Sequence, residues 1–72
     1  MATPFETAYP NVTRWVKSYG WIEIGQDHYS RSLVRALDEG GLVWEGKSNY
    51  ESLDEALQAL EAGLAEWMTQ NT

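Results

Sequence analysis

The stretch "SRSLVRALDEGGLVWEG" (residues 30–46) decides the fold, because its first half can be interpreted in two ways. The apolar side chains of that half fit one face of a helix that would end at Gly40. The alternative is a β-hairpin, with strands at about 31–37 and 42–46 around the turn "DEGG". Two glycines between apolar runs favour the hairpin, and "LVWE" is strand-like and needs a neighbouring strand. We therefore expect the hairpin.

The register of this hairpin stays open. A two-residue turn at 39–40 places Arg35 opposite Trp44. A three-residue turn places Arg35 opposite Glu45, an attractive cross-strand ion pair. Because successive residues of a strand point to opposite faces, the register decides which face of the sheet carries Trp44.

The segment "PNVTRWVKSYG" before the hairpin predicts a short helix over 10–19. Its apolar side chains recur with helical spacing, and we expect them to face the core: Val12, Trp15, Val16 and Tyr19. Pro10 suits the first helical position, and Gly20 suits a left-handed cap at the end.

The next segment, "WIEIGQ", predicts a strand. Ile22 and Ile24 would share one face of it. Trp21 and Glu23 would share the other face.

The last element, "SNYESLDEALQALEAGLAEWM" (48–68), predicts an amphipathic helix. Ser52 and Glu55 form an S-x-x-E capping box at its start. Its apolar stripe consists of Leu53, Ala56, Leu57, Leu60, Leu64, Trp67 and Met68. Gly63 is unusual, because glycine within a helix costs roughly 1 kcal/mol relative to alanine. It indicates either close packing against a tryptophan or a strand, or a close crossing by a helix of another subunit.

Together these elements predict an α+β fold in the order α-β-β-β-α. A three-stranded antiparallel sheet with two helices packed on one face is the natural two-layer arrangement. We expect residues 1–9 to form a flexible N-terminal arm, in which Phe5 or Tyr9 could dock, and residues 10–70 to form a single domain.

Size and composition limit the class of protein. A chain of 72 residues forms one small domain with a marginal core, and without cysteine it has no disulfide or thiolate metal site. The net charge of −6 argues against binding nucleic acid or an anionic membrane, and it suits a basic partner. The sequence predicts neither a transmembrane helix nor a signal peptide, so we expect a cytoplasmic protein.

The order α-β-β-β-α at this length resembles the double-stranded-RNA-binding domain. That family has a lysine cluster at the start of its last helix, where it holds phosphates. This chain has Asp54 and Glu55 at that place, and two acids there would repel a nucleic-acid backbone. We therefore expect no nucleic-acid binding.

The last helix also resembles that of the HicB-type antitoxin half-fold, in which three strands lead into a helix much like "ESLDEALQALEAGLAEWM". The resemblance covers about 20–68 and lacks that family's Pro-Asp-Leu-Pro-Gly-type loop between the strands. It implies a role in neutralising a toxin partner. The chain as a whole resembles small bacterial proteins without an assigned activity, which supplies no site.

The residues that catalysis or metal binding needs are scarce. His28 is the one histidine, in the turn-like segment "QDHYS", where Asp27 and Ser30 lie close in sequence without forming a triad. One histidine without cysteine does not make a usual zinc site. We expect no enzyme activity, cofactor or metal; an enzyme or small-ligand binder that uses His28 is the alternative of a different class.

The strand tryptophans are the best candidates for function. Trp21 and Trp44 would share the sheet face that the helices leave open, unless one or both lie in the core or cover the sheet edge. In the first case they would anchor an interface whose polar rim is Glu23 and Arg35. The sequence therefore predicts a protein-binding domain, or a homodimer formed through the same face or through an exposed sheet edge.

Overall fold

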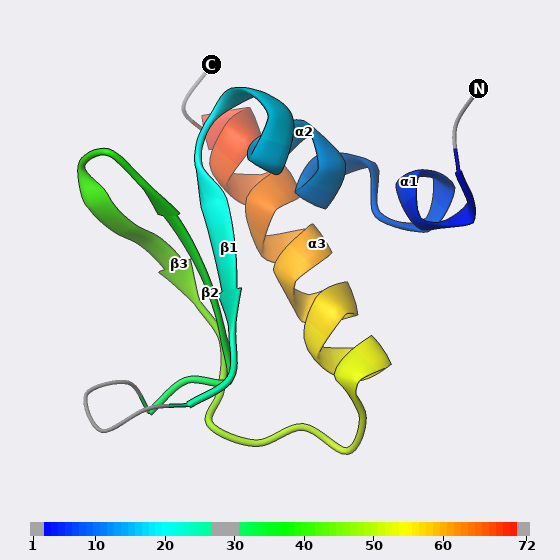
Figure 1. Cartoon of the computed structure of the whole chain (residues 1–72), viewed down its shortest axis with the longest axis vertical. Helices are drawn as coiled ribbons and strands as arrows, with labels where there is room; N and C mark the ends of the chain where they lie inside the picture. Colours follow the sequence, from blue (N-terminus) through cyan, green and yellow to red (C-terminus); the bar gives the residue numbers. More distant parts are fainter. Residues whose placement is uncertain (1–2, 27–30, 71–72) are drawn as a thin grey trace.

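A computed structural model describes residues 3–26 and 31–70 of the chain. Along the described residues the elements are α1 (Pro4–Ala8), α2 (Pro10–Ser18), β1 (Trp21–Ile24), β2 (Val34–Asp38), β3 (Gly41–Glu45) and α3 (Leu53–Gln70). The strands form an antiparallel sheet in the order β1-β2-β3, and α2 and α3 lie on the same side of it (Figure 1). The predicted α+β fold in the order α-β-β-β-α is confirmed, and α1 is added to it.

The predicted hairpin is confirmed, and it combines both of the registers that the sequence leaves open. The strand pairs are Asp38–Gly41, Leu37–Leu42, Ala36–Trp44 and Arg35–Glu45. Next to the turn the pairing is that of a two-residue turn, with Gly41 at a φ of +114° that side chains disfavour. A β-bulge then makes Val43 an extra residue on β3, so that Arg35 lies opposite Glu45 after all.

The core lies between the sheet and the two long helices. Its buried apolar residues are Val12, Trp15, Val34, Ala36, Ala56, Leu60, Leu64 and Met68. Trp15 is 0% exposed, and its indole Nε1 donates to the carbonyl oxygens of Trp21 (3.1 Å) and Leu37 (3.2 Å). Because its indole N–H is hydrogen-bonded, Trp15 can lie fully buried at the centre of a small core.

Helix α2 is confirmed, but two details of its prediction are wrong. Val16 and Tyr19 are exposed, so only half of the predicted stripe faces the core, although Tyr19 still stacks on the Trp15 ring with centroids 5.3 Å apart. Gly20 is not left-handed; it is needed because a Cβ there would collide with the carbonyl oxygen of Leu37. Close approach to β2 explains this glycine.

Helix α3 begins at the predicted Ser52 cap, whose hydroxyl accepts from the backbone N–H of Glu55 (3.1 Å), which is one of the two hydrogen bonds of the predicted capping box. Its buried residues are Ala56, Leu60, Leu64 and Met68. Gly63 lies against the indole of Trp44, and a Cβ at this position would collide with that ring. The glycine therefore serves packing within the chain, the first of its two predicted explanations.

The N-terminus of α2 is capped by α3. The residue before the helix, Tyr9, makes no side-chain cap. The Glu61 carboxylate instead accepts from the backbone N–H groups of Asn11 (2.9 and 3.0 Å) and Val12 (2.9 Å) and from the Asn11 amide (2.6 Å). A negative charge at the positive end of the α2 dipole fixes the two helices relative to each other.

The segment predicted as a flexible arm contains the helix α1. Thr3 and Glu6 form a reciprocal capping box around Pro4, and Lys17 of α2 pairs with the Glu6 carboxylate at 3.1 Å. The backbone N–H of Thr3 and the charge of Lys17 lower the pKa of Glu6 below its ordinary value. These contacts attach α1 to the outside of α2, and α1 contributes no buried residue.

Candidate interaction face

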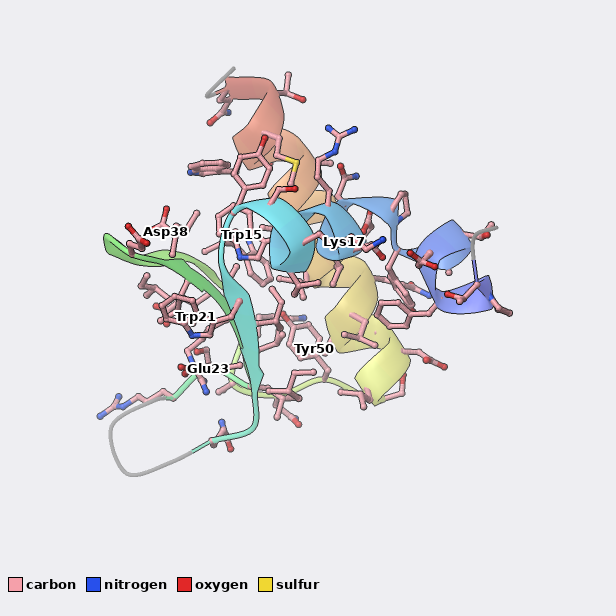
Figure 2. All side chains as sticks on the ribbon, turned by 45° about the horizontal axis from the view of Figure 1, so that its top comes forward. Trp15, Lys17, Trp21, Glu23, Asp38 and Tyr50 are labelled. Atoms are coloured by element: carbon pink, nitrogen blue, oxygen red, sulfur yellow. The ribbon has the colours of Figure 1, made fainter. Side chains whose placement is uncertain are left out.

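One face of the sheet lies opposite the two long helices, and we call it the open face. Ala36 is buried beneath the helices, so its neighbours along β2 point the other way. Residues directly opposite in antiparallel strands share a face, which gives the open face Trp21, Glu23, Arg35, Leu37, Leu42 and Glu45. Figure 2 shows Trp21 and Glu23 on the far side of β1 from Trp15 and Tyr50.

An apolar row crosses the open face next to the hairpin turn. Trp21 on β1 pairs with Leu37 on β2, which in turn pairs with Leu42 on β3. Trp21 is 45% exposed and Leu42 is 53% exposed, while Leu37 between them is partly buried. The row therefore presents two large apolar side chains to the surroundings over the width of the sheet.

A charged row lies beside the apolar row, one step toward the other end of the strands. It consists of Glu23, Arg35 and Glu45, one from each strand. The two oxygens of the Glu23 carboxylate are used differently: one lies 3.3 Å from Nε of Arg35, and the other accepts from Nε1 of Trp21 at 3.3 Å. Glu23 thus links the two rows and orients the exposed indole.

Arg35 is the buried member of the charged row, with a side chain only 8% exposed. One terminal nitrogen donates to the Ser32 carbonyl (2.6 Å) and hydroxyl (3.3 Å), and the other donates to the Gly25 carbonyl (2.8 Å). The carbonyls that converge on the guanidinium satisfy its donors but do not neutralise its charge. The Glu23 carboxylate neutralises that charge. Arg35 therefore holds the ends of the β1–β2 connection, and the exposed charges of the row are carboxylates.

Trp44 does not belong to this face. It pairs with Ala36, packs against Gly63 of α3 and is partly buried. The expectation that Trp21 and Trp44 share the open face is wrong, because the bulge at Val43 turns Trp44 toward the helices. Of the predicted interface residues, the structure brings together Trp21, Glu23 and Arg35.

Leu37 and Leu42 complete the apolar row and were missed by the sequence reasoning. A signal for them was present, since a two-residue turn pairs Leu37 with Leu42 across the hairpin. The prediction chose the two strand tryptophans as interface residues, because tryptophan anchors are common in interfaces.

Other kinds of site find little support in the described part of the chain. Neither a cavity nor a group of three metal-ligating side chains is found among residues 3–26 and 31–70. His28, the basis of the enzyme or ligand-binder alternative, lies outside the described residues. None of the described helices has the length and apolar character that crossing a membrane requires.

Comparison with known proteins yields no relative. No family model, no curated protein and no solved structure matches the chain.

Proposed function

We propose that the chain is a non-catalytic domain that binds another protein through the open face of its sheet, in the cytoplasm. The observation that carries the proposal is the exposed apolar row of Trp21 and Leu42 on a sheet face opposite the helices. Exposed apolar side chains that gather on one face of a small domain are typical of interaction sites. An indole oriented by a hydrogen bond loses little conformational entropy on binding.

The charges beside the row point to the chemistry of the partner. Glu23 and Glu45 flank it with exposed carboxylates, while the one cation of the charged row is enclosed by carbonyls. A segment with an aliphatic or aromatic side chain and a lysine or arginine beside it would complement this pattern. A guanidinium stacked on Trp21 would gain a cation–π contact as well.

Capture from cells that naturally contain the chain tests the proposal. The bait is the full chain, compared with a double variant, Trp21→Ser with Leu42→Ser, that removes both exposed ends of the apolar row. Leu53→Ser is the matched control, because Leu53 is 52% exposed on the first turn of α3, away from the open face. We expect a protein that the native chain and the control retain and that the double variant loses.

Salt gives a second readout in the same experiment. Because the proposed contact includes carboxylates opposite cations, raising the ionic strength should weaken capture. Equal capture by all three baits, or capture lost only with Leu53→Ser, would refute the open face as the binding site.

A further inference from the structure

Among residues 3–26 and 31–70, no strand pairs with the outer edge of β1, which carries free backbone hydrogen-bonding positions. The amide N–H of Gly25 donates to the carbonyl of Leu33 on the β2 side. In an antiparallel pair this direction alternates along the strand, so Trp21 and Glu23 also face β2, and the N–H and C=O groups of Ile22 and Ile24 face outward. In Figure 1, β1 is the outermost strand of the sheet on its side.

The two edges of the sheet differ in how they would accept another strand. On β3 the bulge at Val43 interrupts the regular alternation of hydrogen-bonding groups. On β1 the sequence "WIEI" contains no proline, lysine or glycine, and its pairing with β2 is regular from end to end. Bulges, prolines and lysines protect an edge, as do a short strand and charged side chains. β1 has four residues and one charge, Glu23, but no bulge, proline or lysine, so it is the more competent of the two edges for pairing.

We propose that two copies of the chain pair through β1, antiparallel about a two-fold axis, and form one continuous sheet of twice the width. A strand edge is complementary to itself when it runs antiparallel, so one surface serves both copies. The inference goes beyond the proposed function, since the pairing requires only the edge of β1. It would also join the two open faces side by side.

The side chains select one register. Within β1 the outward groups belong to Ile22 and Ile24, so each hydrogen-bonded pair between the copies includes at least one of these two residues. A sheet centred on Glu23 would place that carboxylate opposite its own copy, which is unfavourable. Pairing Ile24 with Ile24 would place Glu23 opposite Gly25, beyond the end of β1, and gives the shortest overlap of the two strands. Pairing Ile22 with Ile22 of the second copy instead sets Trp21 opposite Glu23 on both sides of the axis. This repeats between copies the indole–carboxylate pairing found within each chain.

Charge gives this dimer a distinctive dependence on salt. Each copy has a net charge of −6, so the copies repel one another, whereas strand hydrogen bonds and apolar contacts are insensitive to salt. Association should therefore strengthen as ionic strength rises. Capture of a basic partner by the open face should respond in the opposite direction.

Sedimentation of the full chain over a range of concentrations, up to roughly 1 mM, tests the proposal, since even a weak interface associates there. We expect a reversible dimer, stronger at high salt. Ile22→Pro removes the outward donor at the centre of this register and no bond to β2, and it should weaken association by about tenfold or more. Ile22→Val keeps the donor and should associate like the native chain.

Contacts between copies in solution provide a readout that does not depend on a variant folding. In a dimer of labelled and unlabelled chains, the selected register brings the Hα atoms of Trp21 and Glu23 of different copies together, which a filtered nuclear Overhauser experiment detects. A monomer at all concentrations would overturn the proposal, as would a dimer without this contact. A monomer that still captures a host protein through the open face would refute only the pairing.

Discussion

Each face of this small sheet carries a tryptophan, but one tryptophan packs against the helices and the other is exposed. Trp44 on one face lies against Gly63 and helps close the core, while Trp21 on the other face stays half-exposed, held by Glu23. The difference arises from the backbone, because one bulge at Val43 decides which way Trp44 points. A tryptophan in a strand therefore says little about function until the register is known.

The largest expected effect on stability is the difference between replacing Trp44 and replacing Trp21 with alanine. Trp44→Ala leaves a void beside Gly63 and should lower the free energy of unfolding by about 3 kcal/mol. Trp21→Ala removes a cross-strand neighbour of Leu37 and an exposed hydrogen bond to Glu23, and it should cost less than about 1 kcal/mol. Urea unfolding of both variants measures the contrast, and equal losses would mean that the two faces do not differ as described.

Arg35 and Glu23 extend the comparison of buried with exposed residues to a single face, because Arg35 is buried on the open face while Glu23 beside it is exposed. Arg35→Met keeps the volume of the side chain but leaves the carbonyls of Ser32 and Gly25 without a donor, at a cost of about 2 kcal/mol. Glu23→Gln, at a position 46% exposed, should cost less than about 1 kcal/mol. Thermal unfolding separates the two, and a harmless Arg35→Met would show that the guanidinium does not hold the strand connection.

A substitution at Gly63 tests the packing of Trp44 against α3, on the face of the sheet that the helices cover. Alanine normally stabilises a helix relative to glycine by roughly 1 kcal/mol. Gly63→Ala should instead destabilise the chain by about 1 kcal/mol, since the new methyl group displaces the Trp44 ring. With Trp44→Leu as background, the same substitution should become neutral or stabilising. A stabilising Gly63→Ala in the native background would contradict the packing.

The smallest effect concerns α1 and depends on pH. Glu6 has a lowered pKa in the folded chain, so its contribution is fully present above its ordinary pKa and is lost as pH falls through the lowered value. We expect the Thr3 amide resonance, whose N–H donates to Glu6, to change in that acidic range while signals of the core do not. With Lys17→Gln the change should move to higher pH; an unchanged midpoint would show that Lys17 does not act on Glu6.

Much of the fold could be predicted from local patterns. The apolar periods gave α2 and α3, and the paired glycines gave the hairpin, because these signals act over a few residues. The T-x-x-E box of Thr3 and Glu6 is a local signal for α1 as well, although the predicted flexible arm did not include a helix there. The cap that Glu61 places on α2 joins residues far apart in the chain, and a local pattern does not reveal it.

The candidate site was predicted only in part, for a related reason. Strand alternation placed Trp21 and Glu23 on one face. Arg35 was added to the predicted interface through its place opposite Trp44 or Glu45 in the hairpin, and the pairing of β1 with β2 sets it opposite Glu23. Trp44 was misplaced because the bulge shifts the register by one residue, and such a shift reverses the face of every residue beyond it. The burial of Arg35 depends on the carbonyls of Ser32 and Gly25 converging, which no spacing indicates.

The most direct test of the open face as a binding surface is photo-crosslinking inside living cells that naturally contain the chain. A photoreactive amino acid replaces Leu42 of β3 in one sample and Leu53, the first residue of α3, in another, two side chains of nearly equal exposure on different elements. Our account predicts a discrete adduct from position 42 and none from position 53. An adduct from position 53 alone, equal adducts from both positions, or no adduct from position 42 would contradict it.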